Sequence, residues 1–431
     1  MHCGPWLKRL TALGMVGVVT LGLAGSSSAT TAASAGGSNN SGIPPSAFSD
    51  HTGITATSAN VANVSTLTAG LAKGALVGVQ AYADYVNSTG GINGRKIVVD
   101  SDDDTFTGAG NKQQTQHAIK NDFALVGGFS LVDSFGGALL KQNPGMPDVS
   151  VTLDPHTGTL PNVFSPAPVS DGWNLGPLEY LKKKYPKDIN RVGTLVNDQP
   201  SAITGWKGEK YALEKVGYKV VYEPTYSLTQ TDFTANVIAM KNAGVKMLFV
   251  DQVPGLYASS LLKSLHEQDF HPVVVLGAAA YSNTLVSNSG GAANVNGDYL
   301  DQNQSLYVGG DKGVVPAVGT FLHWVQVASP GFKPDVFTLY GWLSGQLFAE
   351  GLKKAGRNPT RGSLLQALAK ITTFDGNGII APSNPVTKEL SNCYLLGQVV
   401  NGQFVRLDDP PVSSPTKGYR CDYKYVKPPG A

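Results

Sequence analysis

A helical pattern gives way to a strand pattern at Asn87-Ser88-Thr89-Gly90-Gly91-Ile92-Asn93-Gly94-Arg95-Lys96. Apolar residues before this stretch recur at helical spacing, at Leu71, Ala75, Val79, Tyr82 and Val86. Asn87 and the paired glycines end that helix, because glycine takes left-handed backbone geometry without a steric penalty. The apolar run that follows predicts a buried strand over residues 96–99, ending in an acidic segment at 100–104. Together they make one unit of an open parallel sheet.

The same alternation of strands and helices occurs in two series along the chain. The first series predicts strands at 61–64, 96–99, 123–128 and 146–151, and the second at 192–196, 218–221, 245–250 and 272–276. A proline-rich segment at 164–168 separates them. The chain has 431 residues, more than one hydrophobic core usually serves. The sequence therefore predicts an α/β protein with two doubly wound, parallel-sheet lobes.

Four segments resemble one known family. The wording of the glycine break follows the pattern N-x-x-GG-I-x-GR, and LYGWLSGQLFAEGLKKAG (339–356), FDGNGII (374–380) and VVNGQFVRL (399–407) follow in the expected order. These segments resemble type I periplasmic solute-binding proteins of ABC transporters, most closely the branched-chain amino acid-binding (Leu/Ile/Val-binding) family. The resemblance covers residues 54–407.

The resemblance implies a three-crossing hinge, with crossings near 164–168, 299–305 and 374–382. Lobe 1 would comprise residues 54–165 and 303–375, and lobe 2 residues 168–300 and 383–431. A small solute would bind in the cleft, hinge closure would bury it, and ABC permease subunits would receive it. A protein that works by hinge bending is expected to be a monomer. The alternatives are a sensor subunit that signals to a membrane receptor and an exported α/β enzyme.

The N-terminus has the pattern of a secretory signal peptide. Lys8 and Arg9 precede an apolar run at 10–23, which is shorter than a membrane-spanning helix, and small residues follow. We expect a signal peptide over 1–35 and a flexible, glycine-rich leader over 36–53. Ser26 stands where a lipoprotein would carry cysteine. The predicted location is the periplasm, cell envelope or extracellular space, without a lipid anchor.

Cysteine content and net charge further limit the kinds of protein and partner that the sequence allows. Removal of the signal leaves Cys393 and Cys421, which an exported chain is expected to join in a disulfide bond, two unpaired thiols being the alternative. The chain has 33 Lys and Arg and 31 Asp and Glu, so loss of Lys8 and Arg9 leaves 31 of each sign. This balance argues against nucleic acid as a partner.

Ligands of open α/β sheets bind beyond the carboxyl ends of the strands. That rule selects six loops, after Val64, Val126, Val151, Val196, Val250 and Leu276. Within and around them, the predicted ligand-binding residues are Leu67, Phe129, Ser130, Leu131, Thr152, Asp154, Gln199, Gln252, Ala279 and Tyr281. The glutamines would hydrogen-bond a solute, and Phe129 and Tyr281 would stack on it. Tyr257, Trp206 and Trp342 are expected to pack within helices instead.

Two predicted ligand-binding residues have structural alternatives. Asp154 falls where the family's S-x-x-A-T segment has threonine, and a carboxylate there would repel an α-carboxylate. This departure favours a neutral, hydroxylated or cationic solute. The alternative is that Asp154 caps the turn before Pro155. Ser130 could likewise be a helix cap.

Enzyme motifs are missing from the sequence. It has no G-x-S-x-G elbow, no phosphate-binding G-x-x-x-x-G-K-[ST] loop and no H-E-x-x-H pair. Asp102, Asp103 and Asp104 are adjacent, so they cannot all face one metal ion, and a solvated loop is expected there. We predict a binding protein without cofactor or metal.

Overall fold

The computed structural model describes residues 42–168 and 172–429. The predicted signal peptide and the first part of the predicted leader lie outside these residues. From Gly42 onward, the leader includes the 3-10 helix η1 (Pro45–Ser49), which lies against α12 (Arg361–Leu368). Asp50 pairs with the buried Arg361 at 3.0 Å. This part of the leader is therefore attached to the folded chain.

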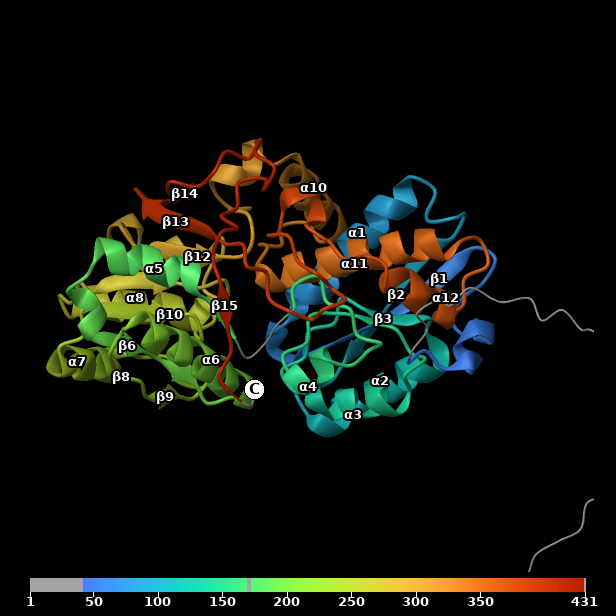
Figure 1. Ribbon diagram of the computed structural model, residues 1–431, viewed down its shortest axis with the longest axis horizontal. Helices are drawn as coiled ribbons and strands as arrows, with labels where there is room; N and C mark the ends of the chain where they lie inside the picture. Colours follow the sequence, from blue (N-terminus) through green and yellow to red (C-terminus); the bar gives the residue numbers. More distant parts are fainter. Residues whose placement is uncertain (1–41, 169–171, 430–431) are drawn as a thin grey trace, which may run out of the picture. The chain divides into compact units, whose positions relative to one another are not determined.

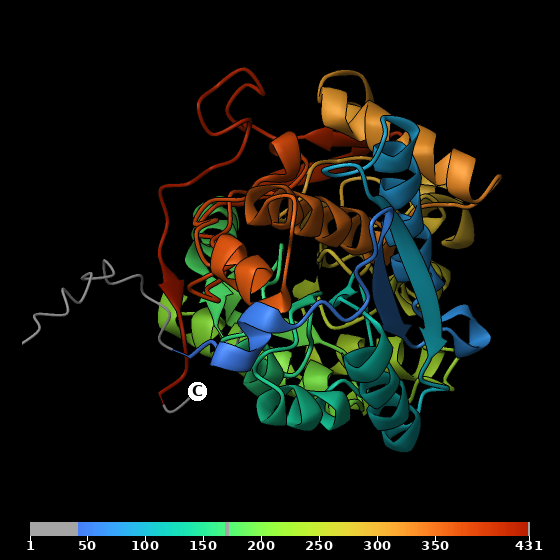
Figure 2. The same ribbon diagram turned by 90° about the vertical axis from the view of Figure 1, so that its right-hand side faces the viewer.

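The first sheet has four parallel strands in the order β2-β1-β3-β4. They are β1 (Ser58–Ser65), β2 (Lys96–Asp103), β3 (Ala124–Val126) and β4 (Asp148–Val149). The helices nearest this sheet are α1 (Lys73–Ser88), α2 (Gly108–Asn121), α3 (Ser134–Gln142), α4 (Pro155–Gly158) and α11 (Val336–Ala355). Successive residues of β1 face opposite sides of the sheet. Val61 belongs to the core with α1 and α11, and Val64, on the other face, belongs to the core with α2 and α3. Helices therefore cover both faces (Figures 1 and 2).

The second sheet has seven strands in the order β14-β13-β12-β11-β10-β6-β8. Its strands are β6 (Val192–Thr194), β8 (Val220–Tyr222), β10 (Met247–Val250), β11 (Val273–Leu276), β12 (Tyr299–Gln302), β13 (Leu395–Val400) and β14 (Gln403–Arg406). The first five of these are parallel, and β13 and β14 are antiparallel additions at one edge. Asn401 and Gly402 join the last two strands with positive φ angles of 49° and 75°, as a tight hairpin turn requires.

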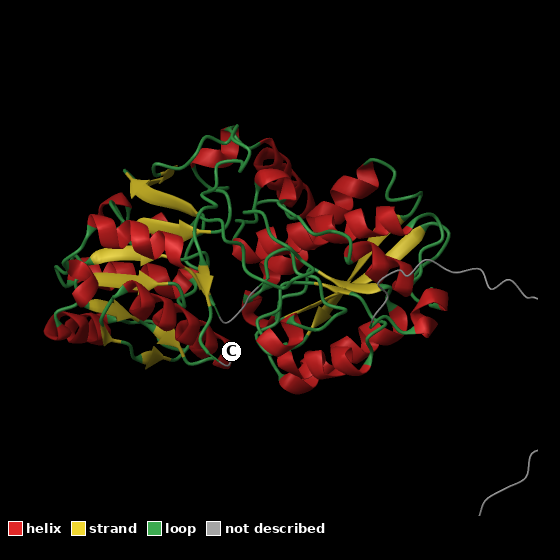
Figure 3. Cartoon of the chain, in the orientation of Figure 1, coloured by secondary structure: helices red, strands yellow, loops and turns green. Residues whose placement is uncertain are grey.

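Helices lie on both faces of the second sheet as well (Figure 3). Met247 and Phe249 pack with α5 (Leu175–Lys184) and α6 (Pro200–Val216), whereas Leu248 and Val250 belong to the core with α7 (Thr234–Ala243) and α8 (Gly255–Glu267). The remaining helices are α9 (Leu285–Asn288) and α10 (Pro316–Ala328), the latter lying beside α1. Two doubly wound sheets are present, as the sequence predicts.

The three segments where the chain was expected to cross between lobes are hydrogen-bonded to one another. The Ser305 amide donates to the Ile379 carbonyl at 2.7 Å, and the Ala381 amide donates to the Asn303 carbonyl at 2.7 Å. The Ser383 hydroxyl donates to the Pro166 carbonyl at 2.8 Å. The lobe boundaries themselves stay a prediction.

The C-terminal segment returns along the second sheet's side of the chain. Cys393 and Cys421 form the predicted disulfide bond, which closes a segment of 28 residues. Beyond it, β15 (Tyr425–Val426) pairs in antiparallel fashion with β5 (Trp173–Asn174), and this segment is drawn in red in Figure 2. A further two-stranded pair joins β7 (Val196–Asn197) to β9 (Thr225–Tyr226).

Candidate functional site

A cavity of about 340 Å³ lies at the carboxyl ends of the strands. It is lined by Leu71, Ala72, Phe129, Leu131, Leu153, Pro155, Ala167, Pro168, Gly172, Trp173, Asn197, Gln199, Ser201, Ala202, Thr204, Gly205, Leu228, Asp251, Gln252, Pro254, Tyr257, Ala278, Ala279, Asn303, Val336, Phe337, Tyr340 and Leu390. All six loops selected by the strand-end rule contribute to this lining. Residues that follow strands of both sheets therefore meet around one space.

The wall on the side of the first sheet is aromatic and aliphatic. Phe129 follows β3, and its ring centroid lies 4.5 Å from that of Phe337 and 6.2 Å from that of Tyr340. The last two residues are on the first turns of α11, which Asp335 begins by accepting a hydrogen bond from the Thr338 amide at 2.9 Å. Leu71, Leu131 and Leu153 extend this apolar surface. Such a wall suits the apolar body of a ligand.

The wall on the side of the second sheet carries amides. Asn197 Nδ2 donates to the Gln252 carbonyl at 2.9 Å, which fixes two neighbouring loops to each other. Gln199 Nε2 donates to Asp198 at 2.9 Å, leaving its oxygen to face other partners. Asn303 also lines the cavity, and its buried Oδ1 has no hydrogen-bond partner among the described residues. A ligand that donates a hydrogen bond would satisfy this oxygen.

Two neighbouring carboxyl groups lie at the amide wall, the half-buried Asp251 in the lining and the fully buried Glu209 behind it. Asp251 lines the cavity, and Glu209 of α6 accepts a hydrogen bond from Gln252 Nε2 at 3.4 Å. Burial raises the pKa of Glu209 to about 8, and burial together with the charge of Glu209 raises the pKa of Asp251 well above its ordinary value. At neutral pH the pair therefore retains a proton that exposed carboxyl groups would have lost.

The described cavity lining contains one acidic side chain and no basic one. Among the described residues that line it, none is Lys, Arg or His, and Asp251 is the one carboxyl group. An ionised carboxylate on the ligand would have no cationic side chain to pair with. The polar part of the described lining therefore consists of uncharged side chains and the Asp251 carboxyl group.

Five of the sequence-predicted binding residues line this cavity: Phe129, Leu131, Gln199, Gln252 and Ala279. Each comes from one of the loops that follow the strands. The aromatic residue and Leu131 contribute to the apolar wall, and the two glutamines contribute to the amide wall. Their position at the cavity therefore follows from the rule that ligands bind beyond the carboxyl ends of strands, whatever the chemistry of their side chains.

The other five predicted residues have structural partners elsewhere. The buried Ser130 hydroxyl donates to Asp104 and accepts from Asn111 Nδ2, and Thr152 lies with it in a second cavity of about 40 Å³. The Leu67 amide donates to Asp103 at 3.0 Å. None of these side chains is among the described lining residues of the main cavity.

Asp154 and Tyr281 are also occupied by structural contacts. Asp154 caps α4, accepting from the Thr157 amide at 2.9 Å and from its hydroxyl at 2.7 Å, which is the alternative that the sequence left open. Repulsion of a ligand by Asp154 is therefore not supported. Tyr281 is fully buried, its oxygen accepts from the Val308 amide at 3.0 Å, and its ring contacts Tyr307 and Phe404.

Several lining residues were not predicted from the sequence. Phe337 and Tyr340 line the cavity, although the sequence analysis singled out neither, and Tyr257, expected to pack within its helix, also lines it. The usable signal was the helix start at Asp335, because side chains on a helix tilt toward its N-terminus, and those of the first turn can therefore reach past that end. Trp206 and Trp342 are buried packing residues, as expected.

The described helices include none that is long and apolar enough to cross a membrane.

A family profile described as periplasmic binding protein matches residues 57–403, which is most of the chain. The protein belongs to the periplasmic binding protein family. A Leu/Ile/Val-binding protein homolog from Brucella abortus (strain 2308) is 24% identical over 298 residues, covering 65% of this chain and 73% of the relative. The family resemblance stated from the glycine break is thus confirmed. Its members are solute-binding proteins rather than enzymes, which confirms the prediction of a non-enzymatic protein.

Solved structures share the type I fold of this periplasmic binding protein. A fatty acid ABC transporter substrate-binding protein from Thermomonospora curvata aligns with a TM-score of 0.70 at 18% identity, covering 85% of this chain and 95% of its own. An ABC transporter solute-binding protein from R. palustris, in complex with benzoate, aligns with a TM-score of 0.67 at 17% identity, covering 84% and 99%. The predicted fold class is confirmed.

Proposed function

We propose that this periplasmic binding protein captures a small amphipathic solute in the cavity and delivers it to the membrane subunits of an ABC importer. The observation that carries the proposal is the composition of the cavity, which combines an aromatic wall from one sheet with an amide wall from the other. A solute that touches both walls stabilises the arrangement in which the walls are close. Binding would therefore shift the population toward a closed state.

The hydrogen-bonded crossing segments are the proposed hinge. They comprise residues 164–168, 303–305 and 379–383. The last two segments exchange backbone hydrogen bonds, and the Ser383 hydroxyl joins the third by donating to the Pro166 carbonyl. We propose that residues 54–165 with 303–375, and residues 168–300 with 383–431, move as two lobes about these segments. The proposed protein is an exported monomer without a lipid anchor, located in the periplasm, cell envelope or extracellular space.

The proposed ligand has an apolar body and an uncharged polar end that donates a hydrogen bond. The apolar body would stack on Phe129, Phe337 and Tyr340, and the polar end would reach Asn303, Gln199 or Gln252. The similar structures named for fatty acid transport and solved with benzoate concern ligands with an apolar body and a carboxylate, so they support the apolar body and not the uncharged end. An amino acid fits less well, because its carboxylate would face a lining without cations.

A thermal-shift screen with matched pairs tests this function. The panel contains aromatic and aliphatic amides and alcohols, the corresponding carboxylates, and branched-chain amino acids. A ligand at 100 times its dissociation constant adds ~2.7 kcal/mol to the free energy of unfolding. We expect the uncharged member of a pair to raise the melting temperature more than its carboxylate. A response restricted to branched-chain amino acids would contradict the proposed ligand class.

Two variants assign the binding to the cavity. Phe129→Ala removes a ring from the apolar wall, and Gln252→Ala removes an amide from the opposite wall; both are expected to weaken binding by at least about tenfold. Gln403→Ala, which alters an exposed glutamine of β14 outside the lining, is the control. Ligand affinity that survives both cavity variants would show that the solute binds elsewhere.

A further inference from the structure

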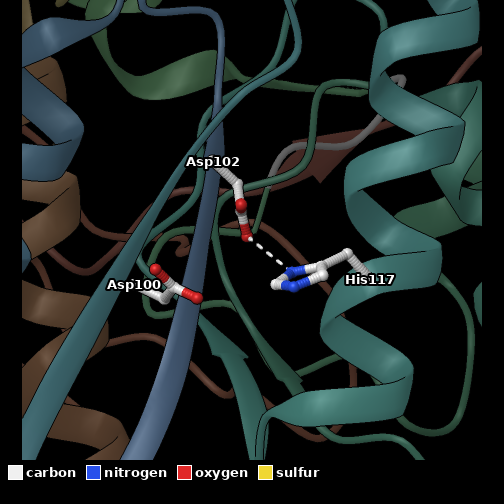
Figure 4. A group of neighbouring side chains, drawn as sticks. All are labelled: Asp100, Asp102 and His117. Carbon is white, nitrogen blue, oxygen red and sulfur yellow. Dashed lines mark ion pairs between the residues drawn. The ribbon is translucent and has the colours of Figure 1, made fainter.

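Strand β2 places two carboxylates on one face of the first sheet. Asp100 and Asp102 are two residues apart, so their side chains point to the same side, toward α2. His117 of α2 faces them, and its Nδ1 lies 3.9 Å from Asp102 Oδ2 (Figure 4). One ligand atom from each of the three side chains lies within 4.8 Å of the others. Two carboxylate oxygens and one imidazole nitrogen therefore lie close enough together for one ion to reach all three after small side-chain movements.

The neighbouring aspartates show that this convergence is not a general feature of the acidic segment. Asp103 accepts from the Leu67 amide at 3.0 Å and from the Thr68 hydroxyl at 2.7 Å. Asp104 accepts from the Thr66 hydroxyl at 3.1 Å and from the Ser130 hydroxyl. Asp102 is different, because its Oδ2 is buried and has no hydrogen-bond partner among the described residues. The expected solvated loop is wrong: Asp102 is 8% exposed and Asp104 is fully buried.

Among the described residues, the buried Asp102 carboxylate has the His117 ring, at 3.9 Å, as its ion-pair partner and no hydrogen bond to its Oδ2 that would compensate for the loss of water. Asp122, which follows the last residue of α2, is also buried, and its Oδ2 likewise has no hydrogen-bond partner among these residues. Three acids thus repel one another beside a single imidazole, with Arg361 near Asp122. A bound cation would offset this repulsion.

We propose that Asp100, Asp102 and His117 form a binding site for a divalent transition metal ion. Imidazole with carboxylates suits Zn²⁺ and its neighbours, whereas Ca²⁺ and Mg²⁺ prefer ligand sets made of oxygen alone. Asp100 is exposed and the His117 side chain is 45% exposed, so an ion can enter from solvent, and water completes its coordination. The bound ion would tie strand β2 to helix α2. None of the three residues lines the solute cavity, so this site stands apart from the proposed function.

Titration of the metal-free, untagged protein with Co²⁺ tests the site. We expect one equivalent to bind, with visible d–d absorption bands that Zn²⁺ abolishes by competition, and a raised melting temperature. His117→Ala and Asp100→Asn should each weaken binding by at least about tenfold. Both side chains are partly or fully exposed, so the variants should fold, which far-UV circular dichroism checks.

Two control variants decide where any bound ion sits. His323→Ala changes an exposed histidine of α10 and should leave Co²⁺ affinity unchanged. His271→Ala removes an exposed histidine paired with Asp269 at 2.9 Å, the other imidazole–carboxylate contact, and should also have no effect. The proposal is overturned if the wild type binds no Co²⁺ at millimolar concentration, if His117→Ala retains full affinity, or if the signal disappears with His271→Ala instead.

Discussion

Glu209 shows how a single buried group can link ligand binding to proton binding. It is fully buried behind Gln252 and next to Asp251, which lines the cavity. Because burial disfavours the ionised form of both groups, and the charge of Glu209 adds repulsion at Asp251, the pair holds a proton at a pH where exposed carboxyl groups are ionised. The retained proton keeps the amide wall free of a second negative charge.

The variant Glu209→Gln should be more stable than the wild type at high pH. The pKa of Glu209 is raised to about 8 in the folded protein against an ordinary 4.5, so its stabilising contribution is complete below about pH 4.5 and is lost as pH rises toward 8. We expect Glu209→Gln to raise the free energy of unfolding at pH 8 by on the order of 4 kcal/mol, and to change it little at pH 4.5.

Urea denaturation at the two pH values measures this difference. Glu214→Gln, an exposed residue of the same helix, is the matched control and should behave as the wild type at both. Equal stabilisation by Glu209→Gln at both pH values would show that proton binding to this carboxyl group does not govern the effect.

At the scale of elements, helices α1 and α11 approach each other through glycines. A Cβ atom on Gly78 would lie 2.0 Å from the Thr338 carbonyl oxygen, and one on Gly341 would lie 2.1 Å from the Ala75 carbonyl oxygen. Both contacts are with backbone, which cannot move aside as a flexible side chain can. The glycines therefore set how closely these helices pack, and α11 in turn carries Phe337 and Tyr340 to the cavity.

Gly341→Ala should destabilise the protein by about 1–3 kcal/mol, since the added methyl group forces the two helices apart. The measurement is the free energy of unfolding from chemical denaturation. Gly319→Ala in α10 is the matched control, because a Cβ there meets nothing within 4 Å, and it should be neutral or stabilising by up to about 1 kcal/mol. Similar losses in both variants would contradict the close packing of α1 on α11.

The elements were largely predictable because their signals are local. Glycine breaks and apolar periodicity predicted the parallel strands of the two main sheets except β12, whose residues were expected to form a crossing between lobes. Strand β2 is longer than predicted and extends through Asp103, because β1 pairs with it residue by residue as far as Ser65. The antiparallel hairpin of β13 and β14 was missed, although Asn401-Gly402 is a strong turn signal. The topology predicted which loops line the cavity, but it did not predict which side chains of those loops point into the cavity. Ala279 lines the cavity and Tyr281 does not, which loop conformation alone decides.

At the scale of the whole molecule, residues far apart in the sequence hold the C-terminal segment in place. The disulfide bond joins Cys393, next to β13, to Cys421, next to β15. Arg420 Nε donates to Asp409 at 2.8 Å, and Arg406 pairs with the buried Asp311 at 2.7 Å. The disulfide bond was predictable, because two cysteines remain once the signal peptide is removed. The two ion pairs were not predictable, because nothing in the sequence around either arginine identifies the aspartate with which it pairs.

The double variant Cys393→Ser/Cys421→Ser should lose ~2–4 kcal/mol of stability, since opening a segment of 28 residues restores freedom to the unfolded chain. Chemical denaturation of the variant gives the measurement, and the wild type in reducing agent should reproduce it. Wild-type protein whose stability does not respond to reducing agent would show that the two thiols are not joined in solution.

The pairing of β15 with β5 connects the disulfide bond structurally to the cavity. Trp173 of β5 lines the cavity and is paired with Val426, five residues beyond Cys421. In an oxidising compartment the cross-link holds the tail near this strand. In a reducing one, the tail would depend on its ion pairs and on short backbone pairings. The redox chemistry of its surroundings therefore bears on the position of Trp173 and, under the proposed function, on how completely a solute would be enclosed.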